Sequence, residues 1–478
     1  MKLKQLFKEI PGVVIRGSKE TLITGLSANS RLVSPGNLFV AKKGLSHDGA
    51  RFIPEAVAAG AAAVLTDLYD PFLPAAVVQV IHPDTAALEA AIAVRYYRFP
   101  AETLSLVGVT GTNGKTTTTY LIKYLFDQLG IPSGLIGTVE WMVGSAILSS
   151  NCTTPDVITT HKLLYEMALA GCKAAVMEVS SHGLDQGRVE GLHFDTAVFT
   201  NLTQDHLDYH KTMERYGAAK ALLFARSRRS VVNADDPFAV SLPHTLTYGI
   251  EHPADLRAKD IVFSPKETRF TLELQGRSWP VILPLIGRFN IYNCLAAFGA
   301  VHLQGLPLEE ALHHLRSFKG VRGRLERVPN KKGLHIFVDY AHTPDALKNV
   351  LELLREIKKG KLVTVFGCGG DRDRTKRPKM GEVVEALSDI VLVTSDNPRS
   401  EDPSAIIAEI VSGFKRPDQA LVEVDRAEAI RRAVRLAGPQ DLVLIAGKGH
   451  ETSQIFAHHT VDFDDRKMAL LACAHSLH

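Results

Sequence analysis

The sequence has few cysteines, and nothing in their spacing suggests that they act together. Five cysteines occur among 478 residues, at positions 152, 172, 294, 368 and 473, with no CxxC pair. An odd and scattered set argues against both a disulfide framework and a thiolate metal site. We therefore expect buried free thiols in a protein of a reducing compartment.

Long apolar runs and a charge excess of either sign are also missing. The longest apolar run, residues 56–65, is about half of the roughly 20 residues that cross a membrane. Lysines at positions 2, 4 and 8 interrupt the apolar centre that a secretory signal needs. The 55 Lys and Arg against 52 Asp and Glu give a net charge of +3, too small a field to hold nucleic acid or an anionic bilayer. We expect a cytoplasmic monomer with no membrane insertion and no nucleic-acid partner.

The composition is that of a globular protein with several domains. Hydrophobic residues make up 45% and charged residues 22% of the chain. At roughly 100 to 200 residues per domain, this length predicts about three domains. Turn-forming stretches at 98–100 and 329–333 suggest the boundaries. We predict domains at 1–100, 101–327 and 328–478.

Short β-rich runs alternate with helix-length amphipathic segments from about residue 104 onward, which predicts an α/β fold. Most of the runs are continuously apolar, as in parallel strands covered on both faces. The strands are expected at 104–110, 174–179, 197–200, 336–339, 362–366, 390–394 and 442–446. The first 100 residues differ, with a strand expected at 38–40 and a helix over 53–63. We interpret them as a separate, small α/β domain.

A glycine-rich segment joins the first of these strands to a helix expected over 119–129. Its backbone N–H groups and the helix N-terminus can surround phosphate oxygens. The lysine would reach the β and γ phosphates, and the first threonine after it offers a hydroxyl to Mg²⁺. The segment consists of Gly111, Thr112, Asn113, Gly114, Lys115, Thr116 and Thr117. It predicts a site for a nucleoside triphosphate, although motor, transport and switch ATPases share such loops.

The loop Gly-Thr-Asn-Gly-Lys-Thr-Thr resembles that of the Mur ligases and the folylpolyglutamate synthetases, which form amide bonds with ATP. Glu178 ends an expected strand, where open parallel sheets place ligand groups. On physical grounds alone, His206 is more often a hydrogen-bonding residue than a Mg²⁺ ligand, and Lys220 is more often a solvated surface lysine.

The resemblance gives these residues catalytic roles. It implies that Thr116, Glu178 and His206 lie around magnesium, and that Lys220 is carbamylated and becomes an anionic oxygen donor to the metal. Lys115 would neutralise charge on the transferring phosphoryl group. The resemblance also implies ATP contacts from Asn293, Arg324 and Asp339.

The last third of the chain carries three polar motifs, at 367–374, 396–399 and 447–451, each after an apolar strand. Loops at the carboxyl ends of parallel strands converge on one crevice. Arg372, Asp396, Arg399 and Glu451 could there hold a ligand with both carboxylate and ammonium groups. An amino acid fits this description, whereas the arginine-rich motif alone could be a solvated charged turn.

Together these motifs resemble the Mur ligases that add meso-2,6-diaminopimelate to a UDP-N-acetylmuramoyl dipeptide in peptidoglycan precursor synthesis. The resemblance implies a three-domain α/β architecture with a central phosphate-loop ATPase domain and a Rossmann-like C-terminal domain. Diaminopimelate differs from lysine by a second carboxylate, which a guanidinium can hold through two parallel hydrogen bonds. Lysine-adding relatives usually lack the arginine at position 399, so Arg399 would be the discriminator.

The remaining substrate contacts are also carried over from this resemblance. The diaminopimelate pocket would comprise Arg372, Asp396, Asn397, Pro398, Arg399, Gly447 and Glu451. The UDP-sugar would contact Ser30, Thr153, Thr154, Ser180, Gln186 and Arg188. The sequence departs from the family pattern at Cys152 and Thr375.

The implied reaction passes through an acyl phosphate, which the amine of the amino acid then attacks. Three alternatives stay open at this point. A lysine-adding Mur ligase would share most motifs, and a folylpolyglutamate synthetase would share the ATP site but need no uridine domain. A non-ligase phosphate-loop ATPase would require a different second half.

Overall fold

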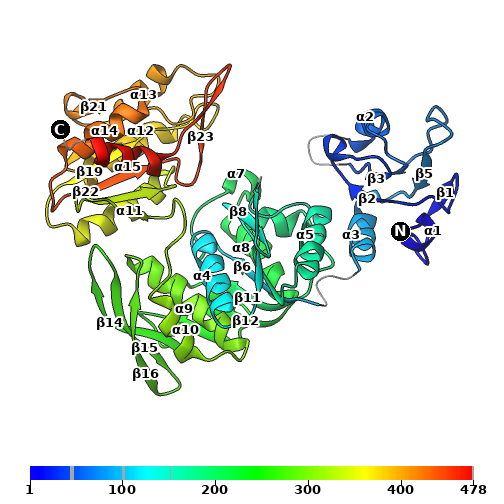
Figure 1. The fold of residues 1–478 in the computed structure, drawn as a ribbon, viewed down its shortest axis with the longest axis horizontal. Coiled ribbons are helices and arrows are strands. Elements are labelled where there is room, and N and C mark those ends of the chain that lie inside the picture. Colours follow the sequence, from blue (N-terminus) through cyan, green and yellow to red (C-terminus); the bar gives the residue numbers. More distant parts are fainter. Residues whose placement is uncertain (44–47, 99–102, 151, 476–478) are drawn as a thin grey trace. The chain divides into compact units, whose positions relative to one another are not determined.

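A mixed five-stranded sheet organises the first part of the chain in this computed structural model, which describes residues 1–43, 48–98, 103–150 and 152–475 (Figure 1). Its order is β1-β5-β4-β3-β2, and only β1 is antiparallel to its neighbour. The elements are α1 (Leu3–Leu6), β1 (Val14–Arg16), β2 (Gly25–Ser27), β3 (Asn37–Val40), α2 (Ile53–Ala58), β4 (Ala63–Thr66), β5 (Val78–Ile81) and α3 (Thr85–Tyr96). Alternate residues of β3 and β4 pack toward α1 and α3 on one face and toward α2 on the other.

The helix predicted over 53–63 is wrong in its second half. The helix ends at Ala58, Gly60 has a φ of +96°, and the apolar run continues into the buried strand β4. Periodicity cannot separate a buried strand from a buried helix in so short an apolar run.

Parallel strands form the centre of the second sheet, in which the strands of residues 105–249 follow the order β13-β12-β11-β6-β10-β7-β8-β9. Among these strands, only β8 and β9, beyond β7, are antiparallel. The strands are β6 (Ser105–Thr110), β7 (Ser133–Ile136), β8 (Glu140–Val143), β9 (Ala146–Ser149), β10 (Ala174–Glu178), β11 (Phe194–Phe199), β12 (Ser227–Asn233) and β13 (Leu246–Gly249). The strands predicted at 104–110, 174–179 and 197–200 are confirmed.

Helices cover this sheet and connect its strands. They are α4 (Lys115–Gln128), α5 (Val157–Leu169), α6 (Ser181–Asp185), α7 (Leu207–His210) and α8 (Met213–Ala225). Helix α4 packs against β6, β7 and β10, whereas α5 and α8 share a core with Leu106, Met177 and Phe199. The strand ends are thereby fixed from both sides of the sheet.

The third sheet has the doubly wound arrangement expected of a Rossmann-like domain. Its order is β17-β18-β22-β19-β20-β21, and only β17 is antiparallel. One set of alternating strand residues packs on α11, α12 and α13, and the other set packs on α14 and α15. The elements are β17 (Glu326–Val328), β18 (His335–Asp339), α11 (Pro344–Ile357), β19 (Leu362–Phe366), α12 (Lys376–Leu387), β20 (Ile390–Val393), α13 (Pro403–Val411), β21 (Leu421–Val422), α14 (Arg426–Leu436), β22 (Leu442–Ala446) and α15 (Asp465–His475). All four strands predicted in this region are confirmed.

The bounds of the remaining strands and helices were not predicted from the sequence. An antiparallel meander comprises β14 (Leu256–Phe263), β15 (Thr268–Leu274) and β16 (Arg277–Leu283). Helices α9 (Arg288–Leu303) and α10 (Leu308–Leu315) follow it, and β23 (Ser453–Ile455) pairs with β24 (Thr460–Asp462).

Two compact units divide the chain, residues 1–254 with 296–311, and 255–295 with 312–478. The predicted boundary at residue 100 lies outside the described residues, and the one at 327 falls within β17. The three domain ranges therefore stay a prediction.

All five cysteines are unbridged, and four of them are buried while Cys152 is partly exposed. Over the described ranges, no helix is long and apolar enough to span a membrane.

Candidate active site

The glycine-rich loop connects β6 to α4, as predicted. The Lys115 Nζ donates to the carbonyls of Gly111 and Thr112, each at 2.9 Å. Gly111 has a φ of +145°, and a Cβ at this position would lie 1.8 Å from the Thr200 Oγ1. The loop therefore requires glycine there, both for its backbone conformation and for the close approach of its neighbour.

A segment after β11 supports the loop from the adjacent strand. The Thr200 Oγ1 donates to the Asn113 carbonyl at 2.6 Å, and the Asn113 N–H donates to the Asn201 Oδ1 at 3.0 Å. Sequence reasoning assigned no role to Thr200 or Asn201. The available signal was that these two polar residues directly follow an apolar strand. Because β11 pairs with β6, the residues that follow β11 lie next to the loop that follows β6.

Glu178 lies at the end of β10 with its carboxylate turned toward the loop. Glu178 is 1% exposed, and its Oε2 accepts a hydrogen bond from the Thr116 Oγ1 at 3.1 Å. Thr138, which follows β7, donates its N–H to Oε1 at 2.8 Å and its hydroxyl to Oε2 at 3.0 Å. Thr138 was not predicted, and a threonine just past the end of an apolar strand would have been its signal.

Residues predicted to contact the UDP-sugar continue from Glu178. The Thr153 hydroxyl shares a hydrogen bond of 3.0 Å with the Thr138 hydroxyl. The Thr154 Oγ1 donates to the Glu178 carbonyl at 2.9 Å and accepts from the Ser180 N–H at 3.0 Å. This network joins the predicted substrate side to the phosphate loop.

Two further predicted contacts belong to the same network, and one does not. Arg188 donates from Nη1 to the Thr154 carbonyl at 2.8 Å and from Nε to the Gln186 Oε1 at 3.1 Å. Ser30 lies on a short turn in the first sheet region, where its hydroxyl donates to the Glu55 Oε2 at 2.7 Å.

Lys220 is buried on α8 and is not a surface lysine. Lys220 is 1% exposed, and its Nζ donates a hydrogen bond to the Gly111 carbonyl at 2.7 Å. The same nitrogen lies 4.3 Å from the centre of the Tyr216 ring. Burial, and then the charge of Lys115, lower the pKa of Lys220 well below its ordinary value.

His206 precedes α7 in the left-handed backbone region, with a φ of +53°. Its Nε2 lies 3.4 Å from the Asp205 Oδ2, and its ring meets the His182 ring edge-on at 4.8 Å. Burial lowers the pKa of His206, against the opposing effect of Asp205. A lowered pKa favours the neutral imidazole, the form that a metal ligand or hydrogen-bond acceptor needs.

The other predicted ATP contacts lie in the second unit. Asn293, on α9, donates to the Asn290 Oδ1 at 3.1 Å, and the Arg324 guanidinium lies 5.1 Å from the centre of the Tyr340 ring. Asp339 ends β18, and burial raises the pKa of its carboxyl. The two oxygens of Asp339 accept from backbone N–H groups at 2.6 and 2.8 Å.

The predicted amino-acid loops meet around Gly369. An added Cβ on Gly369 would lie 2.9 Å from the Arg399 Nη1 and 3.9 Å from the Arg372 Cγ. The Arg399 Nη1 donates to the Gly370 carbonyl at 2.6 Å. Buried Arg377 supports this loop by donating to the Gly369 carbonyl at 3.2 Å. The two predicted arginines therefore flank one small residue.

The same loop cluster also contains acidic and amide groups. Gly447 has a φ of +112°, and a Cβ there would lie 2.5 Å from the Asp396 Oδ2. The Asn397 Nδ2 donates to the Glu451 Oε2 at 2.7 Å. Asp396, Asn397 and Pro398 are buried, whereas Glu451 is partly exposed. Positive and negative side chains thus occur in one loop cluster, as a ligand with carboxylate and ammonium groups requires.

The donor set around Thr116 fits a magnesium ion that is also bound by phosphates. Within the described residues, no group of three or more His, Cys, Asp and Glu side chains could hold a metal ion. The Thr116 hydroxyl and the Glu178 carboxylate are neighbouring hard oxygen donors. Mg²⁺ is commonly held by one or two carboxylates together with substrate phosphates and water.

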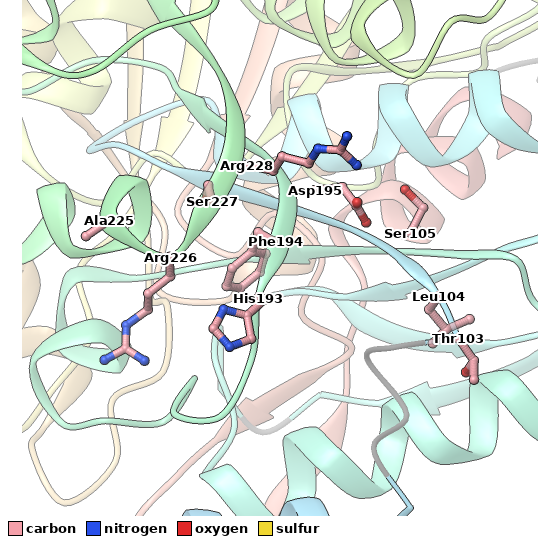
Figure 2. A pocket seen from close by; sticks show the side chains of 10 residues that line it. All are labelled: Thr103, Leu104, Ser105, His193, Phe194, Asp195, Ala225, Arg226, Ser227 and Arg228. Atoms are coloured by element: carbon pink, nitrogen blue, oxygen red, sulfur yellow. The ribbon is translucent and has the colours of Figure 1, made fainter.

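A cavity of about 770 Å³ lies at the amino ends of β6, β11 and β12, away from these residues (Figure 2). Figure 2 shows Arg226 and Arg228 extending in different directions from its wall. Arg226 pairs with Glu190, and the Asp195 Oδ2 accepts from the Leu106 N–H at 2.9 Å. None of the predicted site residues lines it, and parallel sheets bind ligands at their carboxyl ends.

Three protein-family models match successive parts of the chain. Residues 22–102 match "Mur ligase family, catalytic domain", residues 109–301 match "Mur ligase middle domain", and residues 323–449 match "Mur ligase, glutamate ligase domain".

Curated relatives match over almost the full length. A UDP-N-acetylmuramoyl-L-alanyl-D-glutamate--2,6-diaminopimelate ligase of Synechococcus elongatus is 45% identical, over 99% of both chains. The ligase of the same name from Gloeobacter violaceus is 46% identical, over 98% of this chain and 97% of its own. A solved structure with that name is 33% identical with a TM-score of 0.70, covering 100% of this chain and 99% of the other.

Proposed function

The chain belongs to the Mur ligase family, and from this premise we propose that it joins meso-2,6-diaminopimelate to UDP-N-acetylmuramoyl-L-alanyl-D-glutamate in an ATP-dependent, ADP-forming reaction. The product would be a peptidoglycan precursor. The observation that supports this substrate pair best is the Arg399 guanidinium beside Gly369, in a loop cluster that also carries Arg372 and Glu451.

Arg399 favours diaminopimelate over lysine as the amino acid. A planar guanidinium can bind the extra carboxylate of diaminopimelate through two parallel hydrogen bonds. Lysine has a methylene hydrogen in place of that carboxylate and would leave the guanidinium without its ligand. A lysine-adding ligase therefore remains the second candidate, and it is the weaker one.

The phosphate loop and its neighbours have separate roles in the proposed reaction. Lys115 and the loop N–H groups would bind the phosphates and orient the γ-phosphoryl group toward the substrate carboxylate. Thr116 and Glu178 would hold Mg²⁺, which neutralises phosphate charge when bound. The carboxylate of the D-glutamate residue attacks the γ-phosphorus, giving an acyl phosphate and ADP. The amine of diaminopimelate then attacks the acyl carbon and releases phosphate.

Thr153, Thr154, Ser180, Gln186 and Arg188 would bind the muramoyl dipeptide. Thr153 hydrogen-bonds to Thr138, Thr154 donates to the Glu178 carbonyl, and Arg188 donates to the Thr154 carbonyl. This connection to Glu178 supports the proposed role. Ser30 would contact the uridine part of the same substrate. Cys152 adjoins this set, since the Ser150 Oγ donates to its carbonyl at 3.0 Å.

Lys220 is the proposed site of carbamylation. The amine must be neutral to attack CO₂, and the lowered pKa of Lys220 makes the neutral form accessible. The nitrogen would form a bond to the CO₂ carbon and lose a proton, which leaves an anionic carbamate. His206 and this carbamate would complete the metal environment.

The proposed reaction can be tested by measuring the rate of ADP release while single substrates are omitted. A ligase should release ADP at its full rate only when ATP, the UDP-linked dipeptide and diaminopimelate are all present. Omitting the dipeptide should reduce the rate to background, because no carboxylate accepts the phosphoryl group. ADP release that is independent of both co-substrates would instead identify a phosphate-loop ATPase of another class.

Location and oligomeric state are also proposals. The five unbridged cysteines support a reducing compartment such as the cytoplasm, which fractionation would test. A monomer would give a single species of 52.2 kDa in light scattering.

A further inference from the structure

Lys448 is a fully buried cation whose role the predicted site does not include. It follows β22 between Gly447 and Gly449, and its side chain is 0% exposed. Its Nζ donates to the Asn397 Oδ1 at 2.8 Å and to the Glu451 Oε2 at 3.1 Å. Burying an ammonium group is unfavourable unless acceptors compensate it. Both acceptors here are side chains of the proposed amino-acid pocket.

These contacts determine the orientation of the Asn397 amide. The Asn397 Oδ1 accepts two hydrogen bonds, from the Lys448 Nζ and from the Ile455 N–H at 3.1 Å. Because ammonium and backbone N–H groups can only donate, the oxygen of the amide must face them. The Asn397 Nδ2 is thereby turned toward the Glu451 Oε2, to which it donates at 2.7 Å.

The same contacts distinguish the two oxygens of Glu451. Oε2 accepts from both Lys448 and Asn397. Among the residues that the structure describes, none donates a hydrogen bond to Oε1, and the Glu451 side chain is 31% exposed. One oxygen is thus fixed by the protein, and the other is accessible to a ligand.

We propose that Lys448 is a positioning residue for amino-acid recognition, which orients Asn397 and Glu451 so that the Glu451 Oε1 receives the ammonium group of the incoming amino acid. This inference rests on the proposed function. Lys448 does not touch the substrate in this account. It acts through Glu451, so its loss should weaken binding of the amino acid and leave ATP binding unchanged.

A double-mutant cycle tests this role, with diaminopimelate varied at saturating ATP and UDP-linked dipeptide. Glu451→Gln removes the charge that receives the ammonium group, and Lys448→Met removes the buried donor at similar volume. Each change should raise the KM for diaminopimelate by about tenfold or more, with the KM for ATP unchanged. The double variant should be close to Glu451→Gln alone, because both changes remove one interaction.

The outcomes separate the two proposals. Effects of Lys448→Met and Glu451→Gln that multiply in kcat/KM, or an equal rise in the KM for ATP, would show that Lys448 supports the fold only. A Glu451→Gln variant with an unchanged KM for diaminopimelate would refute the proposed pocket itself, and the inference with it.

Two further variants control for folding. Lys348→Met replaces a lysine of α11 whose side chain is 57% exposed, and it should leave the kinetics unchanged. If Lys448→Met fails to fold, Lys448→Gln keeps a donor for the Asn397 Oδ1 without the charge. It should still raise the KM for diaminopimelate, and an unchanged KM would contradict the proposal.

Discussion

At the scale of single residues, Lys220 shows how burial can change what a side chain does. Its nitrogen lies against the Gly111 carbonyl and the Tyr216 ring, with almost no access to solvent. In water a lysine has a pKa of about 10.4 and is nearly always charged at neutral pH. Here burial and the nearby Lys115 charge favour the neutral amine, which is the form that reacts with CO₂.

We predict that Lys220 carries a carbamate when Mg²⁺ and ATP are bound. Protein equilibrated with ¹³C-labelled bicarbonate should show a carbamate carbon resonance that is absent from Lys220→Met. Lys123→Met should keep the resonance, because Lys123 pairs with Asp127 at 2.6 Å on α4. A resonance of equal intensity in Lys220→Met, or none in the unaltered protein, would contradict the assignment.

At the scale of elements, a buried ion pair joins α14 to α15. Arg426, the first residue of α14, donates to both oxygens of Asp465 at 2.7 Å, and both side chains are 0% exposed. The same guanidinium donates to the Ala446 carbonyl at the end of β22 at 2.9 Å. The pair therefore fixes the strand end that precedes Gly447 and Lys448.

We expect Arg426→Met to destabilise this region by about 3 to 5 kcal/mol, because Asp465 would be left buried without its partner. The loss of stability would be measured as faster hydrogen exchange of the α14 and α15 amides. The matched change Arg435→Met, at an exposed pair with Glu428 on the same helix, should alter exchange by less than about 0.5 kcal/mol. Equal effects of the two changes would show that the buried pair has no special role.

Elements whose pattern is local could be predicted from the sequence, whereas those that depend on sheet order could not. The phosphate loop was found because its glycines, lysine and threonines stand together between a strand and a helix. Thr138 was missed because its contact with Glu178 exists only when β7 lies beside β10. Lys448 was missed for a similar reason, since its two acceptors come from a different loop and from the following turn.

At the scale of the whole molecule, the proposed function divides the chemistry between the two units. The phosphate loop, Glu178 and the dipeptide contacts belong to the first unit. The arginines of the amino-acid pocket belong to the second unit, together with the other predicted ATP contacts, Asn293, Arg324 and Asp339. The amino-acid pocket thus lies in a different unit from the loop that would bind the phosphates of ATP. A change in the amino-acid pocket should alter the choice of amino acid without altering the use of ATP.

The most direct measurement is a competition in which the enzyme is offered meso-diaminopimelate and L-lysine together and the products are resolved by mass. The unaltered protein should incorporate diaminopimelate with a preference of about a hundredfold or more, because each of two charged hydrogen bonds contributes about 1.5 to 3 kcal/mol. Arg399→Ala should lose most of this preference through a higher KM for diaminopimelate. Arg374→Ala, an exposed arginine of the neighbouring loop that pairs with Glu409, should keep it. Equal incorporation by the unaltered protein, or an unchanged preference in Arg399→Ala, would contradict the account.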